Sequence, residues 1–259
     1  MKLSWKQIKR KIGFRGPVML MLVIFLPILM IIYSPVKIVL GSLNGVMTFS
    51  SVIFISWMIL SIFAGRGVSC GYLCPYGALQ EVMGGWILNR KAKSSKATKI
   101  KYLSFACFLG LIIYSRIAMG GVRGFDPLLI SSQLNFVGIN SFGVMFIVLI
   151  FMVGVGLFSL LGNRAFCCYL CPQAVFLNIA NKISRFIRIP SLTIKAVPDN
   201  CNDCKLCNHA CPMGLEVESM VNKTETIHSL DNSDCILCGD CIRACKKEAI
   251  AYSFNIPEK

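Results

Sequence analysis

The chain has 259 residues, of which 55% are apolar and only 15% are charged. This balance excludes an ordinary soluble globular protein, in which about a quarter of the residues are charged. The net charge of +15 could suggest nucleic acid, but the basic residues flank apolar stretches, so we expect a membrane and no nucleic acid as the partner.

Residues 1–16 form a basic N-terminal segment with six Lys and Arg residues and no acidic residue. A membrane domain follows over residues 17–190 and contains four apolar stretches, each close to the ~20 residues that cross a hydrocarbon core. The stretches are 17–33 (with an extension to residue 40 past Pro35), 46–64, 102–119 and 139–161. We therefore predict an all-α domain of four transmembrane helices.

Lys and Arg residues are concentrated in alternate loops, which predicts the orientation of the helices. The N-terminus, the loop 65–101 and the segment 162–198 together hold 18 of them, whereas the other side holds only Lys37, Arg116 and Arg123. We expect a multi-pass protein of a bacterial or archaeal cytoplasmic membrane, with both termini in the cytoplasm.

Residues 199–259 form a polar tail with two matching cysteine runs, each spaced C-x2-C-x2-C-x3-C. This spacing is typical of bacterial ferredoxins with two [4Fe-4S] clusters, in which the fourth cysteine of each run ligates the other cluster. It predicts a small α+β bacterial-type 2[4Fe-4S] ferredoxin domain. The first ligand set is Cys201, Cys204, Cys207 and Cys245, and the second is Cys235, Cys238, Cys241 and Cys211. Zinc sites also use x2 gaps, but two matching runs with x3 endings favour clusters.

A second motif, C-x3-C-P, occurs at Cys70/Cys74 and again 97 residues later at Cys167/Cys171. Both copies follow an apolar stretch that ends on the predicted cytoplasmic side, which indicates an internal duplication in parallel orientation. Proline suits the first helical position, so we expect Cys74 and Cys171 at helix starts. The four thiols would be enough for one more iron–sulfur cluster. A redox-active dithiol pair and cysteines that only pack are the alternatives, and Cys168 offers a further ligand spacing.

Each Cys-Pro pair is followed by an amphipathic segment. Residues 172–188 leave cations free for lipid headgroups and put apolar side chains near one face, which is typical of an interfacial helix. The apolar residues are Val175, Ile179, Ile183 and Phe186. On the outer side, a few polar and aromatic residues could line a quinone pocket, although the arginines could instead extend to headgroups. They are Arg116, Arg123, Asp126, Gln133, Tyr114 and Phe125.

With these motifs the chain resembles the NapH-type membrane ferredoxins, which share four spans, two cytoplasmic C-x3-C-P motifs and a C-terminal double [4Fe-4S] module. The membrane part of the regulator NosR and the assembly protein CcoG are similar. The resemblance implies electron exchange between the quinone pool and a partner oxidoreductase, usually quinol oxidation. Among the site residues, it extends to the eight tail cysteines and the four C-x3-C-P cysteines.

We therefore expect a membrane-bound iron–sulfur electron-transfer subunit of the quinol dehydrogenase type. Its cofactors would be two [4Fe-4S] clusters, a candidate further cluster and quinone. The alternative is an assembly or maturation factor for a respiratory metalloenzyme. A membrane redox sensor ranks last, because the sequence shows no output domain.

Overall fold

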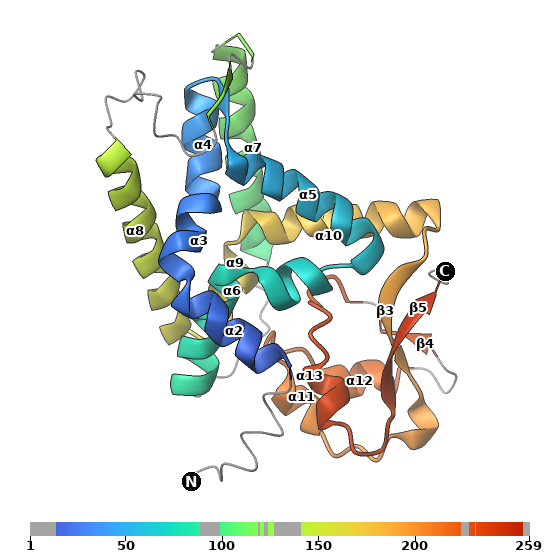
Figure 1. The fold of residues 1–259 in the computed structure, drawn as a ribbon. Coiled ribbons are helices and arrows are strands. Elements are labelled where there is room, and N and C mark those ends of the chain that lie inside the picture. The colour runs from blue at the N-terminus through green and yellow to red at the C-terminus, as the bar shows by residue number, and fades with distance from the viewer. Residues whose placement is uncertain are drawn as a thin grey trace.

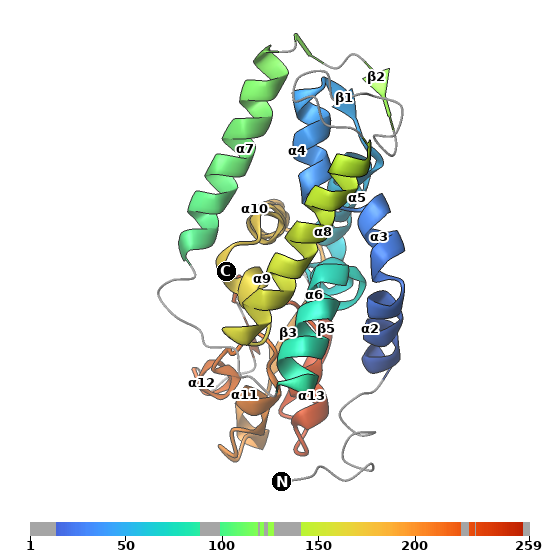
Figure 2. The same cartoon turned by 90° about the vertical axis from the view of Figure 1, so that its left-hand side faces the viewer.

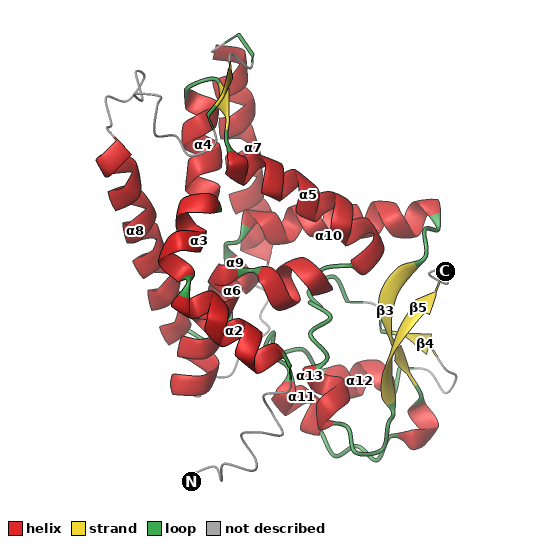
Figure 3. Ribbon diagram, in the orientation of Figure 1, coloured by secondary structure: helices red, strands yellow, loops and turns green. Residues whose placement is uncertain are grey.

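The computed structural model describes residues 14–88, 99–118, 120–121, 124–126, 141–223, 228–230 and 232–255. Most of the basic N-terminal segment therefore lies outside the described residues. The chain forms a helical part and, at one end of it, a small unit of short helices and strands (Figures 1 and 3).

The first apolar stretch is not the single helix that the sequence predicted. It forms three helices that follow one another along the molecule (Figure 2), α2 (Arg15–Ile24), α3 (Leu26–Ile32) and α4 (Pro35–Leu43). A proline lies in the first turn of both α3 and α4. Because proline lacks an N–H and disfavours helix at the preceding residue, each proline starts a new helix. The predicted extension past Pro35 is present as α4.

Two helical segments of the described residues are long and apolar enough to cross a membrane, α7 (Ile100–Ala118) and Gly143–Leu160. The second comprises most of α8 (Ser141–Leu157) and the 3-10 turn η4 (Phe158–Leu160). Large apolar side chains of α8 are exposed, including Leu149 and Ile150. An exposed apolar surface of this kind matches lipid rather than water.

A third candidate span is α5 (Phe49–Ala64) together with the π-helix η1 (Gly67–Leu73), although the two are bent by 114°. Gly65 lies at the bend with a φ of 59°, a left-handed conformation that glycine adopts without steric cost. The described residues thus contain two or three candidate spans, and the count of four stays a prediction. Prolines divide the first stretch, and a glycine bend shortens the second.

The predicted helix starts after the two C-x3-C-P motifs are confirmed. Cys74 is the N-cap residue of α6 (Pro75–Gln80), and Cys171 is the N-cap residue of α10 (Pro172–Ile187), each with proline in the first turn. A π-helix, η2 (Glu81–Ile87), continues α6, and α9 (Ala165–Tyr169) precedes Cys171.

Helix α10 crosses α7 at a steep angle and packs against α5 (Figure 1). Its Val175 is buried inside the protein, whereas Ile183 and Phe186 are 44% and 91% exposed. The predicted amphipathic helix therefore presents an apolar face outward and uses a different face for packing. This arrangement matches an interfacial helix.

The C-terminal unit contains an antiparallel sheet in the order β4-β3-β5. Its strands are β3 (Ser191–Ala196), β4 (His228–Ser229) and β5 (Ile250–Asn255). Among the described residues, the unit also has four short helices: η5 (Pro198–Asn200), α11 (Leu206–Ala210), α12 (Val217–Val221) and α13 (Asp240–Ala244). The central strand β3 begins before residue 199, so the sheet includes residues that the sequence boundaries left between the two domains. At the far end of the helices, β1 (Val46–Met47) pairs in parallel with β2 (Gly124–Phe125).

The C-terminal unit sits directly on η1, where glycines allow two backbones to approach. A Cβ atom at Gly71 would lie 2.7 Å from the carbonyl oxygen of Ile236, and one at Gly67 would lie 3.2 Å from Cβ of Leu237. The segment 236–238 therefore rests on the backbone of the first C-x3-C-P motif. We call this contact the seat.

Replacing Gly71 by alanine should loosen the seat, because the added methyl group meets a backbone atom that cannot move aside cheaply. Overpacking of this kind costs about 1–3 kcal/mol, so we expect Gly71→Ala to lower the thermal midpoint and increase proteolysis of the C-terminal unit. Gly110→Ala is the matched control, because a Cβ there meets nothing within 4 Å. If the two variants have the same thermal midpoint and the same rate of proteolysis, Gly71 is not needed for the close contact.

Candidate metal centres

Four tail cysteines line a cavity in the core of the C-terminal unit. They are Cys211, Cys235, Cys238 and Cys241. Cys238 and Cys241 are buried, and Ile194, Met213 and Ile236 contribute apolar walls. The sequence predicted these four cysteines as the second ligand set.

The other four tail cysteines line a separate cavity. They are Cys201, Cys204, Cys207 and Cys245, the predicted first ligand set. Cys204 is exposed, so this cavity lies nearer the surface than the other. Each cavity therefore combines three cysteines of one run with the last cysteine of the other.

The two ligand loops share one backbone conformation. Asp203 and Lys205 in the first loop have left-handed φ values of 53° and 56°, and Leu237 and Gly239 have 47° and 75° at the matching positions of the second. These turns point backbone N–H groups toward the thiols. Burial raises the pKa of Cys235, and the N–H of Leu237 opposes the rise. Such N–H groups stabilise thiolate ligands.

The tail cysteines do not have the geometry of a single-ion site. In the described part of the chain, no three His, Cys, Asp or Glu side chains converge as the ligands of one metal ion would. Zinc would draw four sulfurs to about 2.3 Å from one centre, whereas each thiolate of an iron–sulfur cluster binds a different iron. Two cavities, each with four cysteines on its wall, fit clusters better than zinc ions.

The four C-x3-C-P thiols form a third group, at the junction of the helices and the C-terminal unit. Burial raises the pKa of Cys74 to about 12, and the thiols of Cys167 and Cys70 add to the rise. Burial likewise raises the pKa of Cys171, with contributions from Cys167, Cys74 and Cys70. Each thiol therefore acts on the others, which places all four in one neighbourhood.

Two buried arginines face this group. Arg66 Nη2 lies 4.0 Å from Cys70 Sγ. Burial raises the pKa of Cys167 to about 11, and Arg164 and Arg66 oppose the rise. Both side chains are only 1% exposed, so the site is arranged to hold negative charge.

Buried polar atoms without a hydrogen-bond partner are concentrated in the two motif segments. Among the described residues they include donors on four side chains: Arg66 Nε, Arg164 Nη2, Gln173 Nε2 and Asn178 Nδ2. Buried donors are normally paired. Unpaired donors in the segments that carry the four thiols fit a group with sulfur acceptors, such as an iron–sulfur cluster.

Cys168 and Cys107 stand apart from this group. Cys168 packs in the core with Ile194 and Leu237, so its packing favours a structural residue over an additional ligand. Cys107 belongs to neither cysteine motif and is exposed on α7.

The outer-side residues that the structure describes differ in their exposure. Asp126 is buried and interacts with Lys37, whereas Tyr114 and Phe125 are 69% and 59% exposed. Arg116 Nη2 donates to the carbonyl oxygen of Val46 at 3.5 Å, so this side chain is bound within the protein rather than extended to headgroups. Arg123 and Gln133, also expected there, lie outside the described residues.

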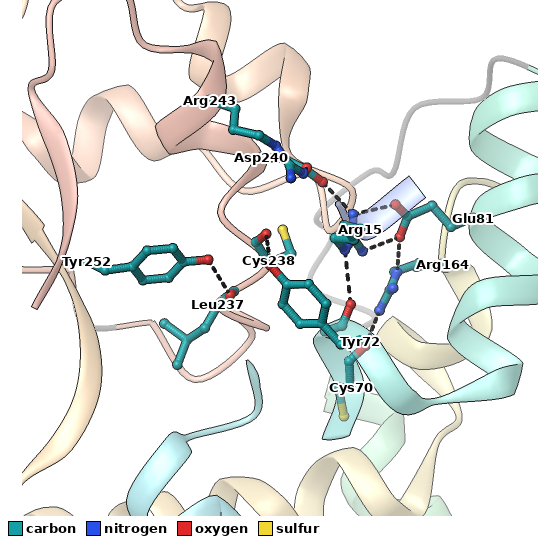
Figure 4. Close-up of polar contacts among 11 residues, drawn as sticks. Arg15, Cys70, Tyr72, Glu81, Arg164, Leu237, Cys238, Asp240, Arg243 and Tyr252 are labelled. Carbon is teal, nitrogen blue, oxygen red and sulfur yellow. Dashed lines mark hydrogen bonds and ion pairs between the residues drawn. The ribbon is translucent and has the colours of Figure 1, made fainter. Parts of the chain in front are cut away.

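A buried charge network joins the helices to the C-terminal unit (Figure 4). Arg15 donates to both oxygens of Glu81 at 2.6 Å and to Asp240 at 2.6 Å. Arg164 donates to Glu81 at 2.8 Å and to the carbonyl oxygen of Cys70 at 2.8 Å. Burial raises the pKa of Glu81, but Arg164 and Arg15 outweigh it, so this pKa is lowered and the carboxylate stays ionised.

Sequence reasoning missed this network, although one signal was present. Glu81 and Asp126 are the only acidic residues in the first 198. An acidic residue that stands alone among basic residues is better explained by a specific ion-pair partner than by a contribution to solubility.

Comparison with known proteins identifies the cysteine regions. The 4Fe-4S binding domain family matches twice, at residues 46–94 and 144–190, and the 4Fe-4S dicluster domain family matches residues 200–250. Each of the two matches of the first family contains one copy of the C-x3-C-P motif. The chain thus carries iron–sulfur domains of both kinds.

Several relatives share these regions. An uncharacterized protein of Methanocaldococcus jannaschii is 29% identical over 210 residues, covering 78% of each chain. Protein NirI of Paracoccus denitrificans is 27% identical over 73% of this chain and 27% of its own length. Regulatory protein NosR of Stutzerimonas stutzeri is 24% identical over 70% of this chain and 25% of its own length. No solved structure matches the chain.

Glu81→Gln should destabilise the protein, because it takes the ionised partner from the buried Arg164 and leaves Arg15 with Asp240 alone. Removing one member of a buried ion pair costs about 3–5 kcal/mol, which thermal unfolding in detergent would detect as a lower midpoint. The exposed Glu216 provides the control variant Glu216→Gln, which should unfold like the unmodified protein. An equal drop in both variants would contradict a specific role for Glu81.

Proposed function

We propose that the chain is a membrane-bound iron–sulfur subunit that carries single electrons between the quinone pool and a partner oxidoreductase. The observation that supports this most is the pair of cavities in the C-terminal unit. Each is lined by three cysteines of one run and the last cysteine of the other, which is the sharing that two [4Fe-4S] clusters require. Assignment to the NapH type, a quinol dehydrogenase subunit, is part of the proposal.

The ligands of the first cluster would be Cys201, Cys204, Cys207 and Cys245. Those of the second would be Cys235, Cys238, Cys241 and Cys211. When bound, such clusters exchange one electron at a time. The chain supplies the thiolates, holds the loops in matching left-handed turns, and keeps water from the deeper cavity with an apolar wall.

We assign a further iron–sulfur centre to Cys70, Cys74, Cys167 and Cys171. Support comes from the mutual influence of the four thiols, from the two buried arginines and from the open donors around them. A redox-active dithiol pair would leave those donors without a role.

In the proposed topology the chain crosses a bacterial or archaeal cytoplasmic membrane four times, with both termini and the ferredoxin unit in the cytoplasm. The helices α2–α4 would form an interrupted first span, and α5 the second, with α7 and α8 as the third and fourth. The distribution of Lys and Arg supports this orientation.

The iron content of the anaerobically purified protein tests the metal assignment. Three [4Fe-4S] centres correspond to about twelve irons per chain, and two correspond to about eight. We expect the higher count in the unmodified protein and about eight in a Cys70→Ser/Cys167→Ser variant. Cys168→Ser and Cys107→Ser are the controls and should keep the full content. A count of about eight in every protein would leave the motif cysteines as thiols.

A quinol analogue tests the proposed electron donor. Oxidation of one quinol to quinone releases two electrons and two protons, so the visible absorbance of the protein should bleach as two one-electron centres are reduced. Absence of bleaching with the isolated protein and with its membrane complex would contradict the quinone assignment. If deletion left the partner enzyme without its own metal rather than without electrons, the assembly-factor alternative would be favoured.

A further inference from the structure

We propose that Arg15 is a positioning residue that fixes the Cys235–Cys241 loop on the first C-x3-C-P motif and sets the redox potential of the centre held by that loop. The inference rests on the proposed function. It assigns a role to a buried charge that none of the cysteine motifs requires.

The contacts between the two parts of the molecule are concentrated on the segment 233–240. Arg66 Nη1 donates to the carbonyl oxygen of Ser233 at 2.8 Å, and Lys101 pairs with Asp234. Tyr72 Oη donates to the carbonyl oxygen of Cys238 at 3.3 Å (Figure 4). Together with the seat at Gly71, these contacts place the second ligand loop next to the membrane motifs.

The first ligand loop is arranged differently. Its Asn208 accepts from the backbone N–H of Glu218 at 2.8 Å, and its Asp203 accepts from Asn222, both within the C-terminal unit. Cys204 is exposed, whereas Cys238 and Cys241 are buried. The two cysteine sets therefore have distinct environments, one against the helices and one toward the surface.

Arg15 is the residue that ties three separate elements together at this boundary. From the first turn of α2, its guanidinium bonds Glu81 in η2, Asp240 in α13 and the carbonyl oxygen of Gly71 in η1, the last at 3.0 Å. It is 3% exposed. A planar guanidinium can serve several acceptors in fixed directions, which an ammonium group cannot.

The same guanidinium is a positive charge beside the second cysteine set. Cys238 interacts with Asp240, with Arg15 and with Glu81, and of these three only Arg15 is positive. Arg164 interacts with Cys238 as well as with Cys74 and Cys167. In a buried site, charges are weakly screened, and net charge tunes the potential of iron–sulfur centres. A positive charge favours the reduced state, which carries one more electron.

The test is an EPR-monitored redox titration of the purified full chain. Arg15→Gln removes the charge, so the ratio of reduced to oxidised centre at a fixed ambient potential should fall roughly three- to tenfold. A tenfold change corresponds to 59 mV for a one-electron couple. A Cys235→Ser variant identifies which signal belongs to this loop, and the signal of the Cys201 set should not move.

Arg243→Gln is the matched control. Arg243 also pairs with Asp240, but its side chain is 31% exposed and it comes from the same short helix. Solvent screens such a charge, so its removal should change the potential far less. Equal shifts in both variants, equal shifts of both signals, or no shift with Arg15→Gln would overturn the proposal.

Arg15→Lys separates charge from geometry. We expect it to restore most of the potential but not the resistance of the ferredoxin unit to proteolysis, because lysine cannot hold all three elements. It also keeps the proposal testable if Arg15→Gln does not fold. Full restoration of both properties would overturn the positioning role. If the unmodified protein shows no cluster signals, the proposed function itself fails, which is a different result from clusters whose potentials ignore Arg15.

Discussion

A buried carboxylate is tolerated only when charged partners in good geometry compensate for its lost hydration. This constraint organises the junction between the helices and the C-terminal unit. Glu81 is 5% exposed and accepts from two arginines that come from distant parts of the chain. One arginine continues to Asp240 of the ferredoxin unit, and the other to the carbonyl oxygen of Cys70. Removing the carboxylate would take away the ion-pair partner of Arg164 and leave Arg15 with Asp240 alone. The ion pairs of Glu81 with the two arginines therefore hold together the helices, the first C-x3-C-P motif and the C-terminal unit.

The two copies of the duplicated segment have taken different tasks within that arrangement. At equivalent positions 97 residues apart, the first copy has Gly67 and the second has Arg164. Gly67 leaves space for the segment 236–238 of the C-terminal unit, whereas the side chain of Arg164 extends to Glu81 and donates a hydrogen bond to it. Cys74 and Cys171 nevertheless keep the same place at a helix start. The duplication thus preserves the thiols and diverges in the residues that hold them.

The parts of the structure that the sequence predicted are those that local chemistry determines. A cysteine followed by proline sets a helix start at Cys74 and Cys171, because proline fixes the backbone on both sides of the peptide bond. Hydropathy located the apolar stretches but not the division of the first one, since each proline could either kink a helix or end it. The role of β3 was missed because its partner β5 is about sixty residues away, and pairing at that distance leaves no local pattern. The charge network has the same origin, because Arg15, Glu81 and Asp240 meet only after folding.

The connection between the membrane part and the ferredoxin unit is very short. Helix α10 ends at Ile187 and strand β3 begins at Ser191, which leaves three residues with a reach of about 10 Å. Because β3 is the central strand of the sheet, this connection runs into the middle of the unit rather than to a loose edge. The short connection thus gives the C-terminal unit no flexible linker with which it could move between an electron donor and an acceptor. Under the proposed function, a soluble partner would have to come to the membrane surface and dock there.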